Sequence, residues 1–441
     1  MADQTYERDE ELLEARRLRR MELKRKRMIR NRVILGAAAL ALLLLIILIA
    51  RGCGKKEEEI KEPQVPAVVP TVTTPDPADE KPPASTKATL SAVGDIMVYA
   101  SQVQDAKKDD GSYDFLPSLA SVSTLLTASD VTVGNFEANF AGEPYDGFPN
   151  FSAPPSLADT LASLGFDVLQ TANTYSIQGG MTGLSSTINA IRGAGMDSLG
   201  TYLSAEDKEE HQVIIREANG IKIAFIAFTK SVNNMTVPTG SEYAVDLLCT
   251  DYDTTYTKLN SSAITAAVTA AKAKKPDVIV AMLHWGSEFE SGVSELQKQT
   301  TDLLINSGVD VILGSHPHIV GKMELRDAKV DGKDKKVFIA YSLGNFLVGN
   351  ERGQATQAPS SFESVILNLE FTKEGNDTTI TGYNYVPLFI MDNGESAINR
   401  YQVRNVYDVL DSSPDDATKE KMEKAITHIK EKTECDFDRG H

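Results

Sequence analysis

The sequence has little cysteine and tryptophan: three cysteines and one tryptophan occur among 441 residues. Cys53, Cys249 and Cys435 are too few for a disulfide framework, and no two of them have the spacing of a zinc-finger pair. This scarcity excludes a small fold held together by several disulfides. A single bridge between Cys249 and Cys435 stays open for a chain in an oxidising compartment.

Positive charge is scarce beyond the N-terminal segment. Residues 1–32 hold eleven Lys or Arg against seven Asp or Glu, whereas the whole chain carries −17, so the remainder carries −21. A surface of that charge repels phosphate backbones, which argues against nucleic acid as a partner. A polyanionic ligand would need a bound metal or a local basic patch.

One long stretch has no charge at all. Residues 33–50 read VILGAAALALLLLIILIA, between Arg32 and Arg51. As a helix rising about 1.5 Å per residue they would span roughly 27 Å, close to the bilayer core of about 30 Å. A cleaved signal peptide is disfavoured, because the run is too long and no A-x-A site follows it. Arg51 likewise argues against a lipoprotein site at Cys53. We therefore expect a single-pass cell-membrane protein with residues 1–32 as a cytoplasmic basic segment, residues 33–50 as the transmembrane helix, and the rest extracytoplasmic.

A proline-rich segment follows this predicted span. Residues 51–87 contain seven prolines after the charged run KKEEEIKE, a composition that favours extended chain over helix or central strand. We interpret these residues as an extracytoplasmic linker. One folded domain is then predicted for residues 88–403 and a C-terminal helical extension for residues 404–441.

Apolar strand-like runs alternate with helical segments after residue 88, which is typical of an α/β domain with covered sheets. An Asn-Gly turn within EANGIKIAFIAFT predicts a hairpin, so mixed sheets are expected rather than one parallel sheet. Strands are predicted in ATLSAVGDIMV, DVTVGNF, PDVIVAMLHW, DVILG, VFIAYSLGNF, ESVILNLEFT and residues 165–170. Helices are predicted at residues 118–127, 156–164, 183–194, 257–273, 296–307 and 419–432.

Ligand-type side chains recur where the predicted strands end, which is where α/β folds place their sites. Six junctions between a strand and a loop each carry one or two such residues. They are Asp95, Glu137, Asn173, His284, the pair His316 and His318, and Asn345.

Three of the six histidines belong to this set. In an extended segment, His316 and His318 would point both rings to the same side, and Pro317 between them keeps His316 out of the helical region. Three imidazoles with two carboxylates suit zinc, manganese or iron, as one or two ions. The alternative is a hydrogen-bonded polar rim without metal.

The motifs GDIM, NFE, HWGSE, GSHPH and YSLGNF, in this order, resemble those of the CapA capsule-synthesis proteins of the calcineurin-like metallophosphoesterase superfamily. The resemblance covers roughly residues 89–387. It implies a four-layer α-β-β-α sandwich of two mixed sheets flanked by helices. It also implies a part in the assembly of poly-γ-glutamate capsules or another anionic cell-envelope polymer, together with the synthesis or export machinery.

The resemblance assigns roles to single residues. Asp95 matches the first metal-binding aspartate, Glu137 the acidic residue that bridges two metals, and three residues match the histidine ligands. These are His284, His316 and His318. Glu288 matches a family glutamate that binds or supports the substrate and is our second catalytic candidate. Asn135, within the NFE motif, and Asn345 are expected to contact substrate or to hold the ligands in place.

The third motif departs from the family. The family has Asn-Asn-His where this sequence has Asn173, Thr174 and Tyr175. Thr174 occupies the position of a metal ligand, and Tyr175 that of the general acid. Tyr175 is therefore the candidate proton donor, although an unperturbed tyrosine pKa near 10 suits neutral pH poorly. Asn173 is the candidate replacement ligand.

Two functions remain at this stage. The first is an extracytoplasmic enzyme that carries out metal-assisted hydrolysis or transfer on an envelope polymer or phosphoester. The second is a non-catalytic subunit that holds an anionic polymer near its export machinery, with a degenerate metal site.

Overall fold

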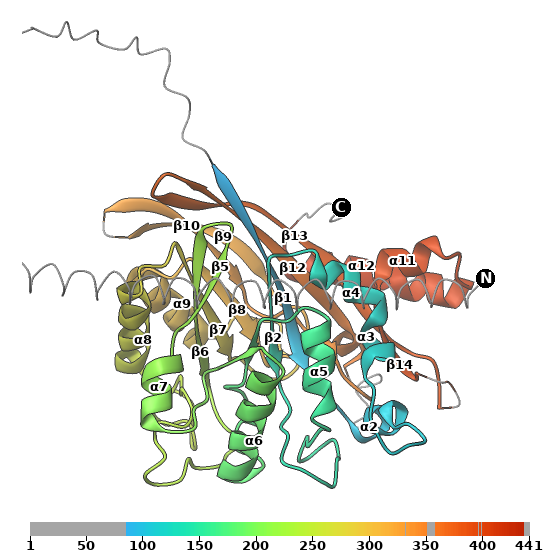
Figure 1. Cartoon of the computed structure of the whole chain (residues 1–441). Helices are drawn as coiled ribbons and strands as arrows, with labels where there is room; N and C mark the ends of the chain where they lie inside the picture. The colour runs from blue at the N-terminus through green and yellow to red at the C-terminus, as the bar shows by residue number, and fades with distance from the viewer. Residues whose placement is uncertain (1–84, 331, 351–357, 396, 398, 436–441) are drawn as a thin grey trace, which may run out of the picture. The chain divides into compact units, whose positions relative to one another are not determined.

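The computed structural model describes residues 85–330, 332–350, 358–395, 397 and 399–435 (Figure 1). They belong to one compact unit that begins at Pro83. The predicted cytoplasmic segment, transmembrane helix and most of the linker lie outside the described residues. In the part of the chain that is described, no helix is both long and apolar enough to cross a membrane.

The larger sheet has the strand order β14-β13-β12-β1-β2-β3-β4, and β11 also pairs with β1. Strands β1 to β4 run parallel, whereas β12, β13 and β14 are antiparallel additions on the other side of β1. The sheet is therefore mixed, as predicted. Its strands are β1 (Thr86–Ile96), β2 (Val131–Phe136), β3 (Val168–Gln170), β4 (Asp197–Leu199), β11 (Asn345–Leu347), β12 (Glu363–Glu374), β13 (Asp377–Asp392) and β14 (Tyr401–Asn405).

The smaller sheet is mixed as well, with the order β5-β6-β7-β8-β10-β9. The predicted hairpin joins its first two strands. Asn219 and Gly220 form the turn with φ of 52° and 80°, and positive φ at both central residues is what a tight type I′ hairpin requires. The strands are β5 (Ile214–Ala218), β6 (Ile221–Thr229), β7 (Val278–His284), β8 (Val311–Ser315), β9 (Met323–Val330) and β10 (Lys333–Ala340).

Helices cover the outer faces of both sheets (Figure 1). The smaller sheet packs against α8 and α9. The helices that pack against the larger sheet are α2 (Ala100–Ala106), α3 (Leu116–Leu119), η1 (Ala120–Val122), α4 (Ser123–Thr127), α5 (Ser156–Ser163) and the C-terminal α11 (Val406–Asp411) and α12 (Asp416–Thr433). The remaining helices are α6 (Gly180–Gly193), α7 (Ala205–His211), α8 (Ser261–Ala273), α9 (Glu295–Ser307) and η2 (Pro359–Phe362).

One hydrophobic core lies between the two sheets. Leu90 of β1 and Phe225 of β6 are fully buried members of it. Ala224 and Ile226, the neighbours of Phe225, pack instead in the cluster beneath α8 and α9. Side chains that alternate between two buried faces explain why the strands read as continuous apolar runs.

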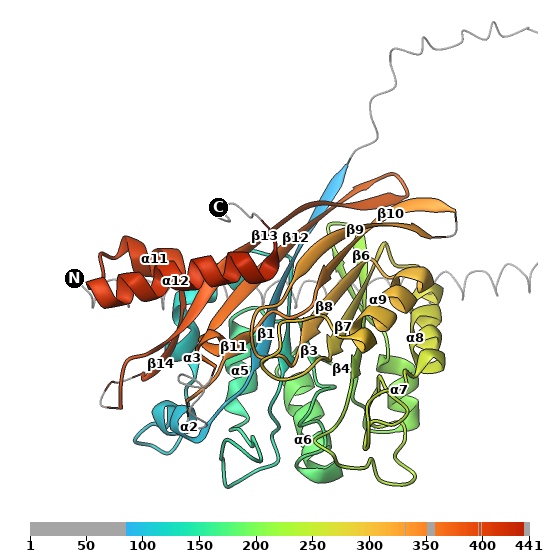
Figure 2. The ribbon, with the colours of Figure 1, turned by 180° about the vertical axis from the view of Figure 1, so that it is seen from behind.

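Most predicted elements are confirmed within a few residues, but the helix expected at residues 118–127 is broken. It forms α3, the 3-10 turn η1 and α4 in succession. The C-terminal helix is confirmed as α12, which lies beside α11 against β13 (Figure 2).

The disulfide that was left open does not form. Cys249 is buried in the cluster beneath α8 and α9, whereas Cys435 packs at the edge of the core between the sheets. The two cysteines are not bonded to each other. Burial raises the pKa of Cys249 to about 11, so it stays a protonated, inert side chain at neutral pH.

Candidate metal centre

The polar residues at the strand ends come together in two groups that share one carboxylate. Glu137, His284 and His316 offer ligand atoms that all lie within 4.8 Å of one another, and so do Asp95, Glu137 and His318. All five residues are buried. We name the first group the His284 cluster and the second the Asp95 cluster. Both match the ligands expected from the sequence.

Asp95 is positioned by the close approach of two glycine motifs. It lies near the end of β1, and its amide donates to the carbonyl of Gly344 at 2.9 Å. A Cβ at Gly94 would lie 1.8 Å from that same carbonyl oxygen. Gly344 itself has a φ of 75°, which side-chain-bearing residues rarely adopt. The glycines of GDIM and SLGNF are therefore needed to bring β1 and β11 together.

The segment His316-Pro317-His318 is not extended, so that prediction was wrong. His316 has a φ of 93° and His318 a φ of 59°, which for non-glycine residues costs of order 1–3 kcal/mol each. The contacts of the clusters hold this conformation. The His316 amide donates to Asp95 Oδ2 at 3.2 Å, and His318 Nδ1 lies 3.0 Å from the same oxygen. Both rings still reach the centre, but through a tight turn rather than by alternation along a strand.

Asn135 and Asn345 support the ligands. Asn135 Nδ2 donates to Asp95 Oδ1 at 2.7 Å and to Glu137 Oε2 at 3.3 Å, so it fixes both carboxylates. Asn345 Oδ1 lies 3.0 Å from His318 Nδ1, and its Nδ2 donates to the His318 carbonyl at 3.2 Å. Asn345 therefore orients the His318 ring as well as its backbone.

The divergent third motif lies directly beside the His284 cluster. Thr174 Oγ1 is 2.9 Å from His284 Nε2 and 3.5 Å from His316 Nδ1. Asn173 Nδ2 donates to the Phe136 carbonyl at 2.6 Å, which ties this amide to the end of β2. A ligand role for Asn173 stays a prediction.

The two catalytic candidates lie on different sides of the centre. The Tyr175 ring packs against Phe151, with ring centroids 4.4 Å apart, in the cluster on the outer face of the larger sheet. Glu288 is half-buried in the loop after β7. Its charge raises the pKa of His318. Their catalytic roles stay predictions.

Two further residues lie beside the centre: Ser315, which the sequence did not single out, and Lys230, for which the sequence left a place near the site open. Ser315 Oγ lies 3.1 Å from His284 Nδ1, and Lys230 directly follows β6. The signal for both was available, because each stands at or just after the end of a strand that borders the site.

Burial and charge set the protonation of the centre. Burial alone would raise the pKa of Asp95, but His318 and His284 outweigh it, and the pKa lies below its ordinary value. Burial raises the pKa of Glu137. Burial lowers the pKa of His316 well below its ordinary value, whereas for His318 the carboxylates of Glu137 and Asp95 overcome burial and raise the pKa to about 9. His316 is thus neutral at neutral pH, whereas His318 is protonated.

These residues fit a divalent cation. Glu137 Oε1 is buried without a hydrogen-bond partner, although it lies 3.2 Å from His284 Nε2. The two atoms lie close together without hydrogen-bonding geometry. A bound cation would satisfy both of them. The imidazole and carboxylate donors suit zinc, manganese or iron.

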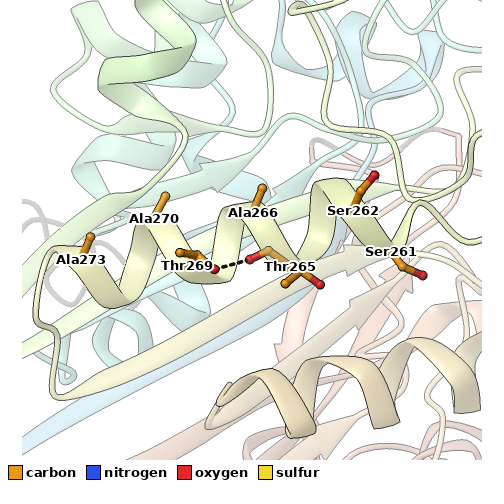
Figure 3. Close-up of a pocket in the computed structure, with 7 residues that line it drawn as sticks. All are labelled: Ser261, Ser262, Thr265, Ala266, Thr269, Ala270 and Ala273. Carbon is orange, nitrogen blue, oxygen red and sulfur yellow. Dashed lines mark hydrogen bonds between the residues drawn. The ribbon is translucent and has the colours of Figure 1, made fainter.

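A hollow on the outer side of α8 has no such chemistry. Small uncharged side chains line it, among them Ser262, Thr265, Ala266 and Thr269 (Figure 3). None of the residues that line this hollow is a carboxylate, histidine or cysteine.

The profile of the family described as "Bacterial capsule synthesis protein PGA_cap" matches residues 89–350. The "Capsule biosynthesis protein CapA" of Bacillus anthracis is 26% identical over 270 residues, which cover 59% of this chain and 60% of that protein. The "PGA biosynthesis protein CapA" of Bacillus subtilis (strain 168) is 26% identical over 271 residues, which cover 58% of this chain and 62% of that protein. The matches thus span about three fifths of the length of these relatives.

Solved structures similar to this chain include the calcineurin-like phosphoesterase YfkN from Bacillus subtilis and a putative 5'-nucleotidase from Staphylococcus aureus. The first is 15% identical with a TM-score of 0.41 and covers 79% of this chain and 100% of that chain. The second is 10% identical with a TM-score of 0.41 and covers 78% of this chain and 58% of that chain. Likenesses this distant say nothing of activity.

The family profile spans more than half of the chain and contains both clusters, from Asp95 to His318. The chain therefore belongs to the PGA_cap family of bacterial capsule synthesis proteins.

Proposed function

We propose that this protein is a membrane-anchored, extracytoplasmic enzyme that uses one or two divalent cations for hydrolysis or transfer on an anionic cell-envelope polymer. The polymer is poly-γ-glutamate or another capsule component, and its synthesis or export machinery would be the partner. The observation that carries the proposal is the buried pair of clusters that share Glu137. The names of the two CapA relatives, which refer to capsule and PGA biosynthesis, support the choice of polymer. The apolar run at residues 33–50 supports the anchor.

A cation held in these clusters would act as a Lewis acid on the attacking water and on the group under attack. The chain's own residues prepare the site for it. Asp95 is kept ionised by its lowered pKa, and neutral His316 offers a lone pair. Asn135 holds Asp95 in place and Asn345 holds His318, which limits rearrangement during the reaction.

Two residues are proposed to act on the substrate. Tyr175 would donate a proton to the leaving group, because it stands in the general-acid position of the family motif, directly after Thr174 at the His284 cluster. Glu288 would contact the substrate from the loop after β7, where it is half-buried.

One observation favours the second candidate function, a polymer-binding subunit without catalysis. Thr174 replaces an amide ligand at the His284 cluster, and the Tyr175 ring packs in a hydrophobic cluster. A single cation in the Asp95 cluster could hold a carboxylate of the polymer without activating water.

The test is metal-dependent turnover by the full-length protein in detergent. We expect Mn²⁺-dependent release of nitrophenol from bis(p-nitrophenyl) phosphate, or shortening of poly-γ-glutamate, and loss of either activity in His284→Ala. His211→Ala, in the last turn of α7, is the matched control. Activity that survives His284→Ala would eliminate the mechanism. Polymer binding without turnover would favour the subunit.

A further inference from the structure

Lys230 lies at the edge of the His284 cluster. It follows β6 directly, and β6 pairs with β7 so that Thr229 stands opposite His284. The Lys230 amide donates to the His284 carbonyl at 2.8 Å. Its charge also contributes to the lowered pKa of His316. The strand register therefore fixes the Lys230 backbone beside His284, and the contact of Nζ with the Gly286 carbonyl keeps the ammonium on the loop that follows His284.

The Lys230 ammonium has an incomplete set of partners. Nζ donates to the Gly286 carbonyl and lies 5.6 Å from the centroid of the Tyr256 ring. Within the described part of the chain it forms no ion pair with a carboxylate. Other half-buried lysines do so, as Lys208 with Asp246 at 2.7 Å.

This arrangement costs free energy in the folded protein. A half-buried ammonium without a carboxylate loses hydration that one carbonyl and one aromatic ring replace only in part. An ammonium has three N–H donors, and Gly286 takes one of them. Two donors are left for a ligand.

The negative charge of the centre favours an ammonium group beside it. Glu137 and Asp95 make the interior of the site acidic, and the whole chain carries −17. Glu288 and Glu290 are close enough to act on the Lys230 charge. An anionic substrate would be repelled without a positive group where it enters, and Lys230 provides one next to the ligands.

We propose that the Lys230 ammonium binds an oxyanion of the substrate on the His284 side of the centre. This inference rests on the proposed function. The oxyanion is a phosphoryl oxygen or a polymer carboxylate, and the ammonium is a compact donor suited to either. Lys230 would thereby set the substrate class as anionic and place the reacting group against the His284 cluster.

The test measures anion binding to the full-length, Mn²⁺-loaded protein by calorimetry, with inorganic phosphate and with a poly-γ-glutamate oligomer as separate probes. Lys230→Gln should weaken binding of one probe roughly 10- to 100-fold, the range of a hydrogen bond to a charged group. Lys230→Arg should restore most of it. The probe that loses affinity identifies the oxyanion.

Lys222→Gln is the matched control, because Lys222 is exposed near the opposite end of the same strand and the change in net charge is equal. Lys230→Met, which keeps the length of the side chain, is the second variant. Bound manganese should stay at the wild-type value in all these variants, and the melting temperature should not fall below that of the wild type.

Three results would overturn the inference. They are equal binding by wild type and Lys230→Gln, equal weakening by Lys222→Gln, and no binding of either probe by wild type. Turnover in the assay of the proposed function is measured separately. If that turnover persists while Lys230→Gln binds normally, only the role of Lys230 fails, whereas loss of metal-dependent turnover in wild type removes the proposed catalysis itself.

Discussion

The Asp95 cluster and the His284 cluster share Glu137, yet their other ligands are held in different ways. Asp95 receives hydrogen bonds from Asn135 and from the His316 amide, and the His318 ring is held by Asn345. In the His284 cluster, the polar group nearest the imidazole nitrogens is the Thr174 hydroxyl.

This difference predicts unequal affinity for cations. The Asp95 cluster offers two carboxylates and one histidine, whereas the His284 cluster offers one shared carboxylate and two histidines. Two negative charges attract a divalent cation more strongly than one, and a neutral hydroxyl is a weak substitute for an amide oxygen. The first cation should therefore enter the Asp95 cluster.

The largest effect is expected from the shared ligand. Glu137→Gln should weaken Mn²⁺ binding at both clusters by at least about 100-fold, because each loses a carboxylate. A Mn²⁺ titration followed by electron paramagnetic resonance measures both affinities, with Glu209→Gln, at an exposed position on α7, as the control. Loss of only one ion would mean that Glu137 is not shared.

The support of the Asp95 cluster can be broken on its own. Asn345→Ala should lower the affinity of the Asp95 cluster for its cation roughly 10-fold or more, because His318 loses its partner. The affinity of the other cluster should stay unchanged. Asn393→Ala, at an exposed turn, is the control for the same titration. Equal weakening at both clusters would contradict the assignment of Asn345 to one of them.

Proton competition separates the clusters in a second way. The proton on His318, whose pKa is about 9, stabilises the metal-free fold fully below about pH 6.5, and that contribution is lost as pH rises through about 9. A cation must displace this proton. The affinity of the Asp95 cluster for the cation should therefore rise up to about tenfold per pH unit from about pH 7 to about pH 8. His316 is already neutral there, so the weaker site should change little. The same titration at two pH values checks this, and a stronger pH dependence of the weaker ion would refute it.

The smallest expected effect is an increase in the cation affinity of the His284 cluster. Thr174→Asn should raise affinity for the second cation severalfold, up to about tenfold, because it supplies an amide oxygen beside His284. The double change with Tyr175→His, which restores the family motif, should also raise turnover of a phosphoester. An unchanged second affinity would show that Thr174 is not what limits this cluster.

The sequence shows which polar residues come together, because the end of a buried strand is visible in the sequence. Asp95, Glu137 and His284 each stand at such an end, and parallel strands bring their carboxyl ends to one edge. The Asn219-Gly220 hairpin was equally local, since the turn chemistry lies within two residues.

What the sequence did not predict depends on contacts between distant segments. The positive φ of His316 is held by Asp95, which is 221 residues away. The break of the expected helix at residues 118–127 follows packing against the larger sheet rather than local propensity. The sequence shows Lys230 just after the end of a strand, but its place beside His284 depends on the register of β6 against β7.

The most direct test of the central claim is the metal stoichiometry of the full-length protein and its variants. We expect two Mn²⁺ ions of unequal affinity, with Asp95→Asn removing the tighter ion and His316→Ala the weaker one. Less than one ion per chain in the wild type, unchanged by His316→Ala, would contradict the metal centre.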